Sequence, residues 1–249
     1  MRLRIATLNI LGTADRWSER RPLVHAAIGK ERPDILALQE VDFAAGQAEE
    51  LLEGWRVFRG DEAEPGFGNA LVVRDLQPDG ADPSWERVEL GEGRCLVTAL
   101  LAMPGGGTLR AGSVHLHWQP DEPQVRARQV ARMLDWIVRA APADRVVIAG
   151  DFNATPDEPA VAAMGGAGFL SAYAAVHGRE PAWTYPSPVT PDDVAIRPPS
   201  CLDYLWVGGS ARVADAWTAF DEPSAANGQL YPSDHRGLVA ELEIGPDAD

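Results

Sequence analysis

The stretch "RVVIAGDFNATPDEPAV" (145–161) decides the fold class of this chain. It begins with a short apolar, β-branched run that is typical of a buried strand. The polar segment "DFNATP" follows at once, and a small helix is predicted over residues 158–164. Loops at strand ends are where α/β proteins place their chemistry. The stretch therefore predicts an α/β fold with functional side chains at Asp151 and Asn153.

The rest of the chain repeats this mixture of strands and helices. Strands are expected over 2–10, 34–41, 69–74, 198–209 and 236–244, with a hairpin where 94–103 and 108–118 flank "PGGG". One helix is expected after an N-cap at Ser18 and before Pro33. A clearer one over 121–141 carries an apolar stripe of Val130, Met133, Leu134, Ile137 and Val138. Turn-rich segments lie at 60–68, 77–84 and 186–199, none of them a linker. The simplest organisation is one mixed α/β domain over residues 1–249.

Several predicted strands end in polar side chains that apolar packing does not require. They are Asn9, Glu40, His115, Asp151 with Asn153, Asp203, and Asp234 with His235. This set contains carboxylates, amides and imidazoles but neither lysine nor arginine, which suits a hard divalent cation and a phosphate. Any one of these residues also fits a helix cap or a solvated charge. Their combination is harder to explain in that way.

Each residue type in this set has a natural chemical role. Glu40, at the end of a buried strand, is the best candidate for a metal ligand. Asp151 could orient or deprotonate a water molecule, and Asn153 could donate an amide hydrogen bond to a phosphoryl oxygen. His235 could stabilise charge or transfer a proton, with Asp203 holding the tautomer of its imidazole.

The segment "HLH" (115–117) also raises the possibility of zinc, because alternate residues of a strand share one face. Neither a cysteine nor a third histidine lies nearby at ligand spacing, so one working histidine and one passive neighbour are favoured. The "GGGT" segment (105–108) is a hairpin turn, since it lacks the Lys-Ser/Thr pair of a phosphate loop.

Asp234 and His235 are adjacent, and adjacent residues of a strand point to opposite faces. The alternation that follows predicts a strand starting near Gly237, so both residues are expected in an irregular loop after Pro232. In such a loop both side chains can face one cleft. Trp118 and Tyr231, which lie beside these motifs, are the aromatic residues expected near the substrate.

In this order and spacing, seven motifs resemble the endonuclease/exonuclease/phosphatase superfamily over nearly the whole chain. They are "TLN" at 7–9, "LQE" at 38–40, "GNALVV" at 68–73, "SVHLH" at 113–117, "IAGDFN" at 148–153, "LDYLWV" at 202–207 and "SDHRG" at 233–237. The resemblance implies a four-layer α/β sandwich of two packed mixed sheets flanked by helices. It also implies hydrolysis of phosphoesters that depends on Mg²⁺ or Mn²⁺.

Carried over by position, the resemblance assigns roles to individual residues. Glu40 would be the principal metal ligand, with Asn9 and Asp234 nearby. Asp151 would activate the attacking water. Asn153 and His115 would contact the phosphate, and His235, oriented by Asp203, would stabilise the transition state or serve as the acid–base group. The long basic insertions of DNA-repair members have no counterpart here. The expected substrate-facing segment, 179–199, is acidic and proline-rich.

The composition of the chain limits the classes of partner and the cellular compartment to be expected. The net charge of -15 argues against a broad basic face for duplex nucleic acid, although a bound cation can reverse charge locally. The N-terminus does not resemble a signal peptide, no apolar run reaches the length of a membrane span, and two cysteines make no disulfide framework. A cytoplasmic enzyme is therefore expected, with a phosphoester substrate (nucleic acid, small phosphodiester or lipid head group) and no evident protein partner.

The favoured function is a phosphodiesterase or nuclease that uses in-line attack by an activated water. A phosphomonoesterase of a small metabolite or lipid head group is the first alternative. A catalytically silent binding protein on the same scaffold is another, because fold does not guarantee activity. A glycosidase using Glu40 and Asp151 would leave Asn153, His115 and His235 without a role.

Overall fold

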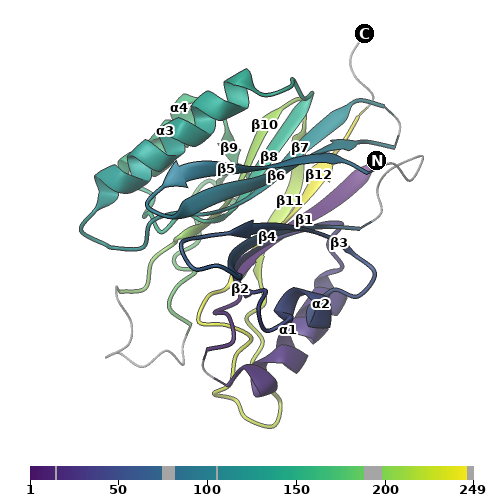
Figure 1. Cartoon of the computed structure of the whole chain (residues 1–249), viewed down its shortest axis with the longest axis vertical. Coiled ribbons are helices and arrows are strands. Elements are labelled where there is room, and N and C mark those ends of the chain that lie inside the picture. Colours follow the sequence, from purple (N-terminus) through teal and green to yellow (C-terminus); the bar gives the residue numbers. More distant parts are fainter. Residues whose placement is uncertain (15, 75–81, 105, 188–197, 246–249) are drawn as a thin grey trace.

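Two six-stranded sheets pack face to face, and helices cover their outer surfaces (Figure 1). The computed structural model describes residues 1–14, 16–74, 82–104, 106–187 and 198–245. The strand order is β11-β12-β1-β2-β4-β3 in the first sheet and β5-β6-β7-β8-β10-β9 in the second. The predicted four-layer sandwich of mixed sheets is therefore confirmed.

The elements follow one another in this order along the described chain. They are β1 (Arg2–Asn9), α1 (Trp17–Glu31), β2 (Ile35–Asp42), α2 (Gln47–Leu51), β3 (Arg56–Asp61), β4 (Phe67–Val73), β5 (Ser84–Gly91), β6 (Arg94–Ala102), β7 (Thr108–His115), α3 (Pro123–Arg139), β8 (Arg145–Asp151), α4 (Pro159–Gly166), β9 (Leu170–Ser171), α5 (Ala172–His177), β10 (Asp203–Gly209), β11 (Arg212–Ala219) and β12 (Gly237–Glu243).

Three apolar clusters hold the layers together. The central one lies between the sheets and joins, for example, Ile5 of β1 with Val97 of β6. A second cluster packs α1 and α2 on the first sheet, and a third packs α3 and α4 on the second (Figure 1). Because the sheets bury both faces, their central strands are nearly continuous apolar runs, which is why the sequence revealed them.

The strands that the sequence did not reveal are edge strands. β3, β5 and β11 each lie at the edge of a sheet. β5 is exposed along most of its length. An edge strand has one unpaired side and carries charged residues that discourage pairing with other chains, so it lacks the apolar run of a central strand. The predicted hairpin of β6 and β7 and the predicted helix at α4 are confirmed.

Two helix details differ from expectation. α1 begins at Trp17 after an N-cap at Arg16, which has left-handed backbone, so the predicted cap at Ser18 is wrong. In α3, Val130 and Met133 are buried, but Val138 is 84% exposed. At about 100° per residue, Val138 lies about 140° around the helix from Met133 and leaves the buried face.

Two parallel strand pairs bring the polar strand ends together. β1 runs parallel to β2 and pairs Asn9 with Gln39, while β7 runs parallel to β8 and pairs His115 with Asp151. The Gln39 side chain donates across the sandwich to the hydroxyl of Ser113 at 3.1 Å. The same end of both sheets thus carries the predicted functional residues.

The remaining sequence-level expectations concern turns, thiols and membranes. Most of the turn-rich segments 77–84 and 186–199 lie outside the described residues. Cys95 and Cys201 are both buried free thiols. Among the described helices, none is long and apolar enough to cross a bilayer.

Candidate active site

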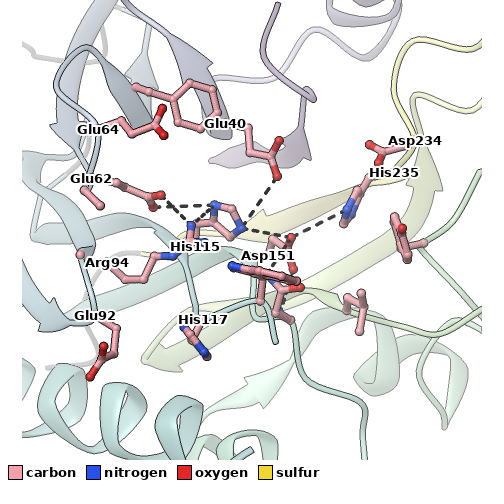
Figure 2. Close-up of a pocket in the computed structure, with 17 residues that line it drawn as sticks. Glu40, Glu62, Glu64, Glu92, Arg94, His115, His117, Asp151, Asp234 and His235 are labelled. Carbon is pink, nitrogen blue, oxygen red and sulfur yellow. Dashed lines mark hydrogen bonds and ion pairs between the residues drawn. The ribbon is translucent and has the colours of Figure 1, made fainter. Parts of the chain in front are cut away.

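A cavity of about 590 Å³ opens at the end of the sandwich where the polar strand ends meet (Figure 2). Most of the predicted residues line it: Glu40, His115, Trp118, Asp151, Asn153, Asp234 and His235. Asn9 and Asp203 lie behind this lining as buried partners of the residues in it. The structure therefore brings residues from opposite ends of the chain into one site.

Glu40 reaches the cavity because β2 departs from regular geometry. Its register with β4 shifts between Leu38 and Val41, and Glu40 has a left-handed φ of 58°. Such backbone costs about 1–3 kcal/mol for a residue other than glycine and is concentrated at functional sites. Asn9 then joins two carboxylates, because its Nδ2 donates to Glu40 Oε1 at 2.9 Å and to Asp151 Oδ2 at 3.1 Å.

Asp151 is the centre of the site. Its Oδ1 accepts from the backbone N–H of Asn153 at 2.8 Å, and Asn153 itself has left-handed backbone. Its Oδ2 lies 3.6 Å from His115 Nε2 and 3.8 Å from His235 Nε2 (Figure 2). Two imidazoles, one at the end of β7 and the other in the loop before β12, thus face one carboxylate oxygen.

His235 is held from behind by an acid. Its Nδ1 lies 2.9 Å from Asp203 Oδ2, and Asp203 is fully buried. Burial alone lowers the pKa of His235, but Asp203 and Asp151 outweigh it and raise that pKa well above its ordinary value. Both carboxylates therefore favour the cationic form of this imidazole, which faces the cavity.

The loop before β12 behaves as predicted. β12 begins at Gly237, and both Asp234 and His235 line the same cavity. The hydroxyl of Ser233 donates to the backbone carbonyl of Asn9 at 2.6 Å, which fixes this loop against the end of β1.

The carboxylates of the site repel one another. Burial and the neighbouring Asp203 raise the pKa of Asp151 to about 7. Burial raises the pKa of Glu40, the hydrogen bond from Asn9 opposes that shift, and Asp234 adds to it. Burial also raises the pKa of Glu62 to about 7. A divalent cation bound among these groups would relieve this repulsion.

Comparison with known proteins identifies this arrangement. The sequence profile described as the endonuclease/exonuclease/phosphatase family matches residues 6–235. The chain belongs to this family. Its members are typically phosphoester hydrolases that use divalent metals. No curated protein sequence matches the chain.

Solved structures of the family share the fold of this chain. The human Nocturnin catalytic domain, solved with bound sulfate, has a TM-score of 0.80 and 22% identity over 98% of this chain and 95% of its own. A humanised D. rerio TDP2 has a TM-score of 0.79 and 20% identity over 98% and 99%. A Bacteroides vulgatus family member has a TM-score of 0.80 and 18% identity over 98% and 100%.

The donor set fits the divalent metal of the family. Glu40 and Asp234 both present carboxylates to the cavity, and hard cations prefer such oxygen ligands. Asp151, Asp203 and His235 form a second group, with ligand atoms within 4.8 Å of one another. In that group His235 Nδ1 and Asp203 Oδ2 already bind each other, so the pair is committed to positioning the imidazole.

Asn9 has a different orientation from the one expected of a ligand. Its amide oxygen accepts from the backbone N–H of Leu11 at 3.0 Å, and its nitrogen faces Glu40 and Asp151. In this arrangement Asn9 organises the carboxylates of the site.

Of the two aromatic residues expected near the substrate, the structure places one at the cavity. Trp118 lines the cavity and is 45% exposed, whereas Tyr231 is not among the described lining residues. Tyr185 lines the cavity instead, with its ring centroid 4.9 Å from that of His235. Tyr185 belongs to the predicted substrate-facing segment 179–199, of which 188–197 lies outside the described residues.

Sequence reasoning also missed Glu62 and Arg94. Both line the cavity beside His115, one from the loop after β3 and the other from the start of β6 (Figure 2). Neither stands at the end of an apolar strand, so nothing in the local pattern distinguished them. His117 lines the cavity too, but its Nε2 lies 2.6 Å from Glu122, a pairing that agrees with a passive neighbour of His115.

Proposed function

We propose that this chain is a divalent-metal-dependent phosphodiesterase in which a water molecule attacks phosphorus in line. The observation that carries the proposal is the convergence on Asp151, whose Oδ2 lies within 4 Å of two histidine Nε2 atoms beside the carboxylate of Glu40. A base, two imidazoles and a metal-binding carboxylate in one cavity are the parts that phosphoryl transfer requires.

Asp151 and the histidines divide the work between attack and charge stabilisation. The Asp151 carboxylate orients the attacking water and accepts its proton. His115 donates its Nε2–H to a non-bridging phosphate oxygen. His235, held by Asp203, presents a positive charge to the phosphoryl group or its leaving oxygen.

Glu40 and Asp234 would hold the metal at the wall of the cavity. A bound divalent cation supplies Lewis-acid polarisation of the phosphate and neutralises its charge. Asn9 keeps Glu40 and Asp151 at a fixed separation through two hydrogen bonds.

The charge of the cavity favours a diester over a monoester. Six carboxylates line it, from Glu40, Glu62, Glu64, Glu92, Asp151 and Asp234. Arg94 is the one arginine among the described lining residues. A phosphomonoester carries a second negative charge near neutral pH, so it is repelled more strongly than a diester by the same carboxylates. The same charge favours small diesters or single strands over duplex DNA.

The structural neighbours keep a nucleic-acid substrate among the candidates. D. rerio TDP2 is known in complex with a single-strand DNA product. A panel of bis-p-nitrophenyl phosphate, p-nitrophenyl phosphate, a single-stranded oligonucleotide and a glycerophosphodiester, each with Mg²⁺ or Mn²⁺, distinguishes these classes.

Asp151→Asn provides the decisive comparison on the diester substrate. We expect a loss of about 10³-fold in kcat, because the base that accepts the proton of the water is removed. Asp157→Asn is the matched control, since Asp157 is exposed and lies six residues further along, in the segment between β8 and α4. Hydrolysis that survives both chelation of metal and the Asp151 substitution would refute the proposal.

A further inference from the structure

We propose that Arg94 is a positioning residue that fixes His115 as a neutral imidazole with its proton on Nε2, facing the substrate phosphate. The inference rests on the proposed phosphodiesterase function for its role in the reaction. Its structural content, the tautomer of His115, stands on the geometry alone.

Arg94 reaches His115 through one nitrogen. Its Nη1 lies 2.8 Å from His115 Nδ1 and 2.6 Å from Glu62 Oε2. An Nη1 group carries two hydrogens, so it can donate one to each partner. The side chains of Arg94, Glu62 and His115 are 14%, 6% and 4% exposed, so water competes little for these bonds.

The contact determines the tautomer because arginine has donors and no acceptor. A guanidinium does not lose its proton in a protein, so His115 Nδ1 must be the acceptor in this pair. A neutral imidazole with an accepting Nδ1 carries its proton on Nε2. That Nε2–H points at the space between Asp151 Oδ2, at 3.6 Å, and Glu40 Oε1, at 4.0 Å (Figure 2).

The Nδ1 atoms of the two histidines of the site therefore face partners of opposite charge. His235 Nδ1 faces a carboxylate, which requires a proton on Nδ1 and favours the cation. His115 Nδ1 faces a guanidinium, which forbids that proton. These contacts favour the cation at His235 and a neutral hydrogen-bond donor at His115, although both direct Nε2 at the same oxygen of Asp151.

The position of Glu62 explains why Arg94 is needed to hold the tautomer of His115. Its Oε1 lies 3.7 Å from His115 Nδ1 and has no hydrogen-bond partner. Without Arg94, this carboxylate oxygen could accept a hydrogen bond from a protonated Nδ1 and so favour the opposite tautomer of His115. The Nε2 atom would then carry a lone pair directed at anionic oxygens. It could no longer donate a hydrogen bond to the phosphate.

Two hairpins hold this group in place. Glu62 follows β3, and Arg94 opens β6 directly after Gly93. A Cβ on Gly93 would lie 2.6 Å from Ala63 Cβ, and Gly93 has a left-handed φ of 70°. The turn therefore needs glycine for the two hairpins to approach closely enough for Arg94 to reach Glu62.

Imidazole ¹⁵N spectra of the metal-free protein test the assignment directly. The nitrogens of His115 are assigned from the signals lost in His115→Gln. We expect a protonated Nε2 and an unprotonated, hydrogen-bonded Nδ1 in the wild-type protein. A wild-type His115 protonated on Nδ1 would overturn the inference.

Arg94→Met removes the donor while keeping an unbranched side chain. We expect the proton of His115 to move to Nδ1 and kcat on bis-p-nitrophenyl phosphate to fall by about 10- to 100-fold, as for other residues that orient a catalytic group. Arg94→Lys keeps a donor without an acceptor, so it should retain the Nε2–H tautomer and recover part of kcat.

Arg110→Met is the matched control. Arg110 is a buried arginine on β7, the strand that ends at His115, and it donates to the carbonyl of Ala141 away from the cavity. It should cost stability without changing the tautomer. An unchanged His115 tautomer in folded Arg94→Met would refute the assignment. A protein with the expected tautomers that cleaves no phosphodiester would refute the proposed function and leave the tautomer assignment supported.

Discussion

Asp203→Asn is the sharpest test of how His235 works. Asp203 Oδ2 accepts from His235 Nδ1 at 2.9 Å, and its Oδ1 is buried without a hydrogen-bond partner. An asparagine can therefore meet Nδ1 with its oxygen and leave its NH₂ buried and unpaired, which costs about 1–3 kcal/mol. It can instead turn its NH₂ to Nδ1, which forces the proton of His235 onto Nε2. Either orientation removes the negative charge that stabilises the cation.

The expected loss follows from the role of that cation. The corresponding substitution in a Ser-His-Asp triad lowers kcat by about 10⁴-fold, and acid–base groups generally contribute about 10²- to 10⁴-fold. We expect kcat on bis-p-nitrophenyl phosphate to fall within that range, or about 3–5 kcal/mol of activation free energy. Asp135→Asn, on the exposed face of α3, is the control and should keep wild-type activity.

Stability should change with pH in a defined direction. Although burial opposes it, the pKa of His235 is raised above its ordinary value of 6.5. The pairing thus stabilises the fold fully below about pH 6.5 and loses that effect as pH rises through the folded pKa. The free energy of unfolding, measured with denaturant, should therefore differ more between the wild type and Asp203→Asn at about pH 6 than at about pH 9. Activity of Asp203→Asn within threefold of wild type would refute this account of His235.

Three further predictions concern other parts of the molecule. Glu40→Gln should raise the Tm of the metal-free protein in calorimetry, because burial and Asp234 raise the pKa of Glu40. The same substitution should abolish the increase in Tm that Mg²⁺ gives the wild type. Cys95 should resist alkylation until unfolding, because burial raises the pKa of its thiol to about 12, and rapid labelling of the native protein would contradict this. Arg20→Met should destabilise the fold by about 3 kcal/mol or more in urea titration. Buried Arg20 donates to the carbonyls of Ile10, at 2.8 Å, and Pro232, at 2.9 Å; an unchanged midpoint would show that those carbonyls find other donors.

The same Arg20 contacts explain how distant motifs form one site. The loop after β1 and the loop before β12 are 222 residues apart at Ile10 and Pro232, and one buried guanidinium joins them. A polar residue of the site lies beside each contact: Asn9 ends β1 directly before Ile10, and Asp234 lies in the loop before β12. A sequence pattern cannot reveal such a contact, because an arginine at the start of a helix is most often a surface charge.

The sequence by itself determined the central strands and the polar residues that follow them. β2 and β8 are buried along most of their length and are mostly apolar, so a polar residue such as Glu40 or Asp151 near the strand end stands out. The loop at Asp234 was also readable, because the alternation of β12 begins only at Gly237.

Tertiary structure decided which partner stands behind each functional group. Arg94 and Glu62 come from hairpins of different sheets, and they meet at His115 only because the sheets pack face to face. The edge strands β3, β5 and β11 lacked a local pattern for the same reason, since their place is set by pairing with a neighbour. Residue type and strand periodicity are local properties of a sequence, whereas the tautomer and charge of His115 and His235 depend on contacts across the sandwich.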